Sequence, residues 1–373
     1  MAGRARLVAA FAVGFTASWS LTNVGSVADR MARAYGVHLA AIGILTSAVF
    51  LVHAAVQLPA GRAIDRYGAR GVGIVSLLAI AVGNVIALSF RDYWVALGAR
   101  ALMGVGTGAG FISGADYVRA AGGGARLQGF YGGATFGATG LAVAIVPQFA
   151  GWRAPYWTAL ALVLPVLILL PFVPSTKRPP QRRSRTPVLS DRRLYRLSFL
   201  HTCSFGISIV AGNWVVTLLT RSGYSHRVAA LAGALTLIGG IVTRPAGGVA
   251  IQRRPERRRA LVAGAVAATS LGILLLASAA PLGVLALAAA VVGLAAGIPF
   301  AAVFRGAQIL RPDAAGTAVG LVNAGPNLFV LIATPLVGLT FSMPGEGRLG
   351  FVALGAVGLT GLALLPPLSS LGR

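Results

Sequence analysis

The chain has 373 residues, of which 56% are hydrophobic and only 11% are charged. Soluble globular domains carry about 25% charged residues, so this composition excludes that class. The net charge of +24 does not indicate nucleic-acid binding, because the arginines stand in short clusters between apolar runs and not on one soluble domain.

Several kinds of chemistry are excluded by missing residues. Cys203 is the single cysteine, which excludes an internal disulfide and a multi-cysteine metal site. Lys177 is the single lysine and follows no glycine-rich phosphate loop, so ATP hydrolysis by that loop is excluded as well. The sequence has no H-E-x-x-H motif and no G-x-S-x-G motif. We therefore predict no enzyme activity, no catalytic residue, no cofactor and no metal.

Apolar runs of helix length follow one another along the chain, and each is long enough to cross a ~30 Å hydrocarbon core. The first run, which follows Arg4 and Arg6, resembles a signal peptide, but its length and the later runs favour an uncleaved helix. The runs predict twelve spans, with Pro281 separating the ninth from the tenth. They lie near 7–27, 40–60, 72–90, 93–115, 129–149, 155–174, 197–219, 228–250, 260–280, 283–304, 316–340 and 350–366.

Basic residues are concentrated in every second loop and in the segment 175–196, which is rich in proline and arginine. Because positively charged loops stay in the cytoplasm, we expect an inner-membrane protein with both termini cytoplasmic. The segment 175–196 is predicted to be a cytoplasmic linker that can rest on anionic lipid head groups. It would join an N-terminal six-helix bundle, 1–174, to a C-terminal six-helix bundle, 197–373.

The loop between the second and third spans carries the most specific motif. It reads G-x-x-x-D-R-x-G-x-R, with Gly61, Asp65, Arg66, Gly68 and Arg70 at the fixed positions. This loop resembles the cytoplasmic signature of the major facilitator superfamily. Arginines that only set orientation are an alternative explanation of the loop, but that alternative does not require the acid. We expect Gly61 to pack closely on a neighbouring helix and Gly68 to adopt a turn closed to larger residues.

Two further stretches strengthen the resemblance. Arg100-x-x-x-Gly104-x-Gly106 in the fourth span is similar to a pattern of the superfamily. The run from Gly248 to Arg253 repeats the start of the signature loop half a chain later, with Gln252 in place of the acid. The resemblance implies twelve transmembrane helices in two pseudo-symmetric six-helix bundles, which move a small solute by alternating access.

The resemblance also implies a latch that closes the cytoplasmic face. Asp65, Arg66 and Arg70 would form it together with Asp116 at the inner end of the fourth span, and Asp65 would face the start of the eleventh span. Such contacts must break when the face opens.

Arginines inside the membrane are candidates for substrate binding, because a charge there is costly unless it is used or paired. Arg100 lies in the fourth span and Arg244 in the eighth, and a structural role is the alternative for both. The stretch from Arg244 to Gly248 also resembles the eighth helix of nitrate and nitrite porters. The matching arginine in their second span is absent, and His53 and Gln57 occupy that region.

Other intramembrane groups complete the candidate site. His53 and His201 can carry a proton because their pKa values are ordinarily near neutrality. No acid lies deep within a predicted span, which favours an anionic substrate over a cationic one. Efflux of drugs or metabolites is a further alternative. Helix-to-helix hydrogen bonding is the alternative for the polar residues of spans one, seven and eleven. These candidates for substrate binding are Trp19, Asn23, Asn213, Trp214, Asn323 and Asn327.

The expected partners are a small-molecule substrate, a coupling proton or counter-anion, and the lipid bilayer, and the protein is expected to be a monomer. Glycines at four-residue spacing, such as Gly129, Gly133 and Gly137, predict close helix packing. A membrane sensor or scaffold on a transporter fold, or a membrane enzyme, is the alternative function.

Overall fold

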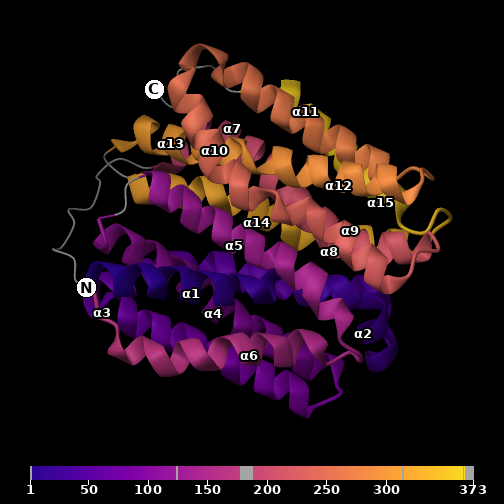
Figure 1. Ribbon diagram of the computed structural model, residues 1–373, viewed down its shortest axis with the longest axis horizontal. Helices are drawn as coiled ribbons and strands as arrows, with labels where there is room; N and C mark the ends of the chain where they lie inside the picture. The colour runs from indigo at the N-terminus through magenta and orange to yellow at the C-terminus, as the bar shows by residue number, and fades with distance from the viewer. Residues whose placement is uncertain (1, 123–124, 177–187, 313–314, 364, 366–373) are drawn as a thin grey trace.

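The computed structural model describes residues 2–122, 125–176, 188–312, 315–363 and 365, and all regular structure in them is helical (Figure 1). Eleven of the described helical segments are long and apolar enough to cross a membrane, and a further apolar helix, α15, has 16 residues. The predicted all-α membrane fold is therefore confirmed.

The N-terminal half, which we define as residues 2–176, contains six main helices. The helix α3 covers two spans that meet at Gly68, whose φ of 78° and ψ of 162° are not helical. A short helix, α2, follows the first span. The bounds are α1 Ala2–Thr22, α2 Ala28–Tyr35, α3 Leu39–Ser89, α4 Tyr93–Ala120, α5 Ala125–Ile145 and α6 Ala154–Leu169.

The first three spans of the C-terminal half, residues 188–365, run from α7 to α11. The span α7–α8 contains the π turn η5, and π turns often occur at functional sites. The next span is divided at Gly239 into α9 and α10. The bounds are α7 Arg192–His201, η5 Thr202–Gly206, α8 Ile207–Arg221, α9 His226–Ile238, α10 Gly240–Arg253 and α11 Arg258–Leu276. Because α7 begins at Arg192, the last five residues of the predicted linker are helical.

The last three spans are α12–α13, α14 and α15. The helix α12 starts after Pro281, which confirms the predicted separation from α11. Pro299 begins α13, where its missing N–H interrupts the span. The bounds are α12 Leu282–Gly297, α13 Pro299–Leu310, α14 Ala315–Thr340 and α15 Arg348–Ala363.

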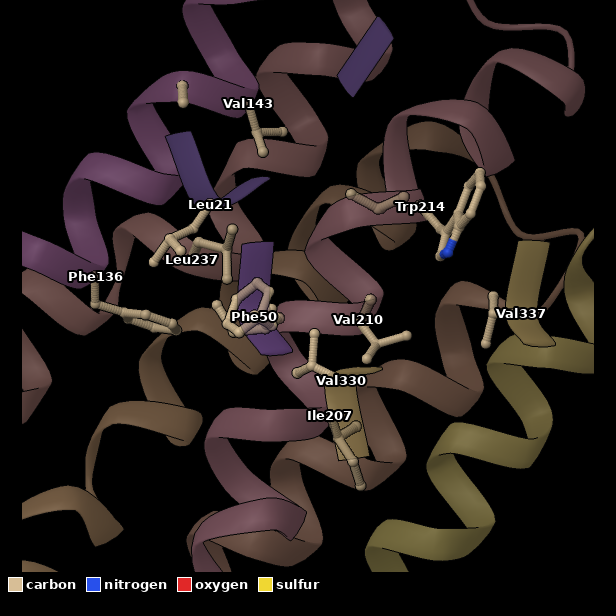
Figure 2. Packing of buried hydrophobic residues seen from close by; sticks show 14 of the residues in the cluster. Leu21, Phe50, Phe136, Val143, Ile207, Val210, Trp214, Leu237, Val330 and Val337 are labelled. Atoms are coloured by element: carbon tan, nitrogen blue, oxygen red, sulfur yellow. The ribbon is translucent and has the colours of Figure 1, made fainter. Parts of the chain in front are cut away.

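The long helices run side by side along the molecule, with those of the N-terminal half on one side and those of the C-terminal half on the other (Figure 1). Two seams join the halves: α5 packs on α9 and α10, and α3 packs on α14. A buried apolar cluster continues across this boundary and includes Leu21, Phe50 and Phe136 of the N-terminal half together with Leu237 and Val330 of the C-terminal half (Figure 2).

Glycines allow the backbones to approach along the first seam. A Cβ added at Gly133 would lie 2.7 Å from the carbonyl oxygen of Ile241, and one added at Gly137 would meet the Ile241 side chain. The predicted close packing of this row is confirmed. No such approach is seen at Gly61, where a Cβ would meet no atom of the described residues within 4 Å.

Candidate functional site

A narrow chamber lies between the two halves. Its volume is about 50 Å³, which has room for a few water molecules, whereas pockets for drug-sized ligands measure roughly 300–1,000 Å³. The chamber is therefore too small for a drug-sized ligand in this conformation. The lining residues are Ser18, Leu21, Phe50, His53, Phe111, Thr135, Phe136, Thr139, His201, Phe205, Ile209, Arg244, Phe300, Phe304, Asn323 and Asn327.

Arg244 is the one arginine among the described residues that line the chamber. It follows the break at Gly239 and is 4% exposed. Its guanidinium carbon lies 4.3 Å from the ring centres of both Phe136 and Phe300 and 5.3 Å from that of Phe205. Desolvated cation–π contacts of this kind are worth about 2 kcal/mol each. Arg244 is thus held by aromatic rings from both halves, because Phe136 belongs to α5.

Within the part of the chain that the structure describes, three buried polar atoms of the chamber residues have no hydrogen-bond partner: Arg244 Nε, His201 Nδ1 and Asn327 Nδ2. A buried polar group that lacks a partner costs about 1–3 kcal/mol, so such groups usually have a use. The described residues that line the chamber include no carboxylate. The chamber therefore presents the positive charge of Arg244, free donors on Arg244 and Asn327, and one unpartnered ring nitrogen of His201.

Asn323 connects the chamber to the side that carries the termini. Its Nδ2 donates to Gln57 Oε1 at 3.3 Å, across the seam between α14 and α3, and its side chain also interacts with His201. His53 lies in the chamber wall, with Nδ1 3.1 Å from Thr107 Oγ1. Thus five predicted site residues meet here: His53, His201, Arg244, Asn323 and Asn327.

Arg100 is placed elsewhere, in the interior of the N-terminal half. It is completely buried, with Nε donating to the Leu45 carbonyl and Nη1 to Asn23 Oδ1, each at 3.3 Å. Asn23 in turn donates to the Pro155 carbonyl at 2.9 Å. These bonds join α3, α4 and α6 to the turn that follows α1, as the structural alternative for Arg100 requires.

The remaining polar candidates also lie outside the chamber lining. Trp19 Nε1 donates to Thr158 Oγ1 at 3.3 Å, and Trp214 Nε1 donates to the Thr334 carbonyl at 2.9 Å. Asn213 Oδ1 accepts from Thr46 Oγ1 at 3.0 Å, across the boundary between the halves. Contact of these residues with a substrate stays a prediction.

The signature loop is tied to the end of the sixth span. Gly68 adopts the positive φ that we predicted, and a Cβ there would collide with Thr176. Thr176 Oγ1 accepts from the Ala69 N–H at 3.0 Å and donates to Asp116 Oδ2 at 2.5 Å. Arg70 donates to the Pro171 carbonyl at 3.2 Å. Asp116 thus reaches the loop through the threonine.

Other latch residues have different surroundings. Asp116 also pairs with Arg119 at 2.8 Å. The guanidinium of Arg66 lies 5.2 Å from the ring centre of Tyr67, which is exposed. The side chain of Asp65 lies outside the described residues, so its contact with the eleventh span stays a prediction.

Two features of the site were missed by the sequence analysis. One is the set of rings around Arg244, because isolated phenylalanines are indistinguishable from core residues in an apolar sequence. The other is a pair of polar contacts between the halves, on the face away from the termini. Arg221 pairs with Asp29 at 2.9 Å, and Arg227 Nε donates to Gln148 Oε1 at 2.9 Å.

Comparisons with known proteins agree with this architecture. The sequence profile of the Major Facilitator Superfamily matches residues 10–334. The crystal structure of the human organic anion transporter MFSD10 (TETRAN) is similar in fold, with a TM-score of 0.70 and 17% sequence identity. The match covers 98% of this chain and 100% of the human one. No protein with a curated description matches the sequence.

Proposed function

This chain belongs to the Major Facilitator Superfamily, and on that premise we propose that it carries a small anion across the membrane by alternating access. The family consists of multi-pass membrane transporters and not of enzymes, so a small-molecule substrate and a lipid bilayer are its partners. The proposal adds the substrate class, the site and the moving parts.

The environment of Arg244 is the observation that carries the anion proposal. Its guanidinium is buried and desolvated, and its Nε has no hydrogen-bond partner among the described residues. An anion would accept a charge-assisted hydrogen bond from Nε, and such bonds are roughly twice as strong as neutral ones. The unpartnered groups of His201 and Asn327 would complete the cradle. The human protein of similar fold is described as an organic anion transporter, which agrees with this substrate class.

We propose the bundles 1–174 and 197–373 as the moving units. Asp29–Arg221 and Gln148–Arg227 join them on the face away from the termini, whereas Gln57–Asn323 joins them between the chamber and the other face. Rocking would break these sets of contacts in turn. With both termini in the cytoplasm, as the charge bias favours, the first set faces outward.

A coupling proton would be carried by the histidines of the chamber. His201 supports this role better than His53, because His201 is linked to Asn323 and has an unpartnered ring nitrogen. A protonated His201 would add positive charge beside Arg244 and favour anion binding. Proton and anion would then move in the same direction.

A thermal-shift screen of the purified protein tests the substrate class. The panel contains nitrate, carboxylates and sulfonates, with matched organic cations and neutral solutes. A ligand present at a hundred times its Kd adds about 2.7 kcal/mol of stability by mass action. We expect Tm to rise with anions in the native protein and in Arg259→Gln, an exposed control, but not in Arg244→Gln. Stabilisation by cations alone, or an equal rise in Arg244→Gln, would refute the proposal.

A further inference from the structure

A long apolar groove runs along the outer surface of the C-terminal half, between α7, α14 and α15. Its volume is about 700 Å³. It arises because α15 packs chiefly on α11, which leaves a gap beside α14. The part between Gly325 and Thr340 of α14 is about 22 Å long at 1.5 Å per residue, most of a ~30 Å hydrocarbon core.

The walls of the groove repeat along both helices. Leu328, Ile332 and Leu336 recur every four residues on α14 and are each more than half exposed. Leu349 and Ala353 continue the same spacing on α15. These rows face outward at the depth of the hydrocarbon, so the groove fits an extended acyl chain lying parallel to the helices.

The end of the groove nearest the termini is basic. Tyr195 and Phe199 of α7 line that end, and Arg192 precedes them by one and two helical turns, so it lies on the same face. Arg192 and Arg196 are exposed, and neither has an ionic or hydrogen-bonding partner in the part of the chain that the structure describes. Arg193, by contrast, is paired with Asp191 at 2.8 Å.

We propose that an anionic phospholipid binds here, with its phosphate at Arg192 and Arg196 and one acyl chain in the groove. The charge at the mouth selects an anionic head group, and the apolar walls select a long chain. This site is separate from the chamber, although the two share a wall. Gly206 of η5 packs on Pro326 of α14, and both elements also line the chamber.

Native mass spectrometry of the purified full chain tests the site by measuring retention of long-chain phosphatidylglycerol. The comparison ligands are long-chain phosphatidylcholine, short-chain phosphatidylglycerol and inorganic phosphate. We expect only the long-chain anionic lipid to bind tightly. Removing both arginines in R192A/R196A should weaken it about thirtyfold, since each arginine near an anionic surface contributes about one kcal/mol. Phosphate binding as tightly as the lipid would show a free-anion site and overturn the proposal.

Two sets of variants test separately the contributions of the two arginines and of the apolar groove to lipid binding. R257A/R259A removes two exposed arginines from the start of α11, away from the groove, and should retain the lipid as the native chain does. Ala353→Trp fills the groove and should weaken lipid binding about tenfold, a change of about 1.4 kcal/mol in binding free energy. If Ala353→Trp does not fold, Ile332→Trp, which changes an exposed position in the same groove, is tested in its place. Equal retention of lipid in the tryptophan variant, or equal loss in R257A/R259A and R192A/R196A, would overturn the site.

Discussion

Arg244 of α10 and Gly132 of α5 join the two halves at the centre of the molecule, where Arg244 Nη1 donates a 2.8 Å hydrogen bond to the Gly132 carbonyl. A hydrogen bond from a charged group contributes about 1.5–3 kcal/mol. Separation of the halves at this seam must break it. An anion on Arg244 could replace the carbonyl as acceptor, which would link ligand binding to movement.

Substitutions of Arg244 should separate its charge from its geometry. Arg244→Lys keeps a positive charge but loses the planar group that fits between Phe136 and Phe300. We expect it to be inserted normally and to raise KM for anion uptake about tenfold or more, since a lost charge-assisted bond costs about 1.5–3 kcal/mol. Arg244→Gln should abolish uptake in proteoliposomes. Native kinetics in either variant would show that the guanidinium does not contact the substrate.

A side chain at Gly132 should disturb the packing around Arg244. A Cβ there would lie 3.0 Å from the Phe300 ring, which is closer than ordinary contact, so Gly132→Ala should shift this ring relative to the guanidinium of Arg244. We expect uptake to fall several-fold while the protein remains inserted. Gly264→Ala is the matched control, because a Cβ there meets no atom of the described residues within 4 Å and alanine favours the helix. Equal uptake by the two variants would contradict the required close approach.

The contact between Gln57 and Asn323 should limit access to the chamber from the side of the termini. Gln57→Ala removes the acceptor of the 3.3 Å bond. We expect an impermeant thiol reagent on that side to label Thr135→Cys, inside the chamber, several-fold faster. Gln128→Ala, whose bond to the Ala115 carbonyl lies within the N-terminal half, should leave the rate unchanged. The native chain, whose single cysteine is the buried Cys203, gives the background rate of labelling.

Thr176 should stabilise the signature loop through its hydroxyl. Thr176→Val leaves the Ala69 N–H without its acceptor and removes one donor to Asp116, both at a buried position. A buried polar group left unpaired costs about 1–3 kcal/mol, so Tm of the purified protein should fall. Thr176→Ser keeps the hydroxyl, so its Tm should be close to that of the native protein. Melting of both variants at the native temperature would mean that the loop is held by other contacts.

Much of the fold could be predicted from the sequence, because the hydrocarbon core imposes helices of known length. The apolar runs predicted the spans, and the break at Pro281 was placed correctly. The internal interruptions at Thr202–Gly206 and at Gly239 were not predicted, because the hydropathy pattern continues through them. Such interruptions depend on packing between helices that are distant in the sequence.

The candidate site could be predicted only in part. Polar residues in an apolar span stand out, so Arg244, His201 and Asn327 were named from the sequence alone, and the structure places them around one chamber. The same reasoning could not separate Arg244 from Arg100, because both are arginines within spans. Both keep one buried nitrogen without a partner among the described residues, Arg100 Nη2 and Arg244 Nε. Their difference comes from location, because Arg100 bonds to Asn23 and Leu45 inside the N-terminal half, whereas Arg244 lines the chamber.

The most direct test of alternating access is anion flux through a chain whose halves are joined at the face away from the termini. Asp29 and Arg221, which pair at 2.9 Å, are replaced by cysteines and bridged with a short bifunctional thiol reagent. We predict that bridging stops uptake of the anion that most raises Tm, and that Asp29→Cys alone, treated in the same way, transports normally. Undiminished flux through the bridged protein would contradict the account.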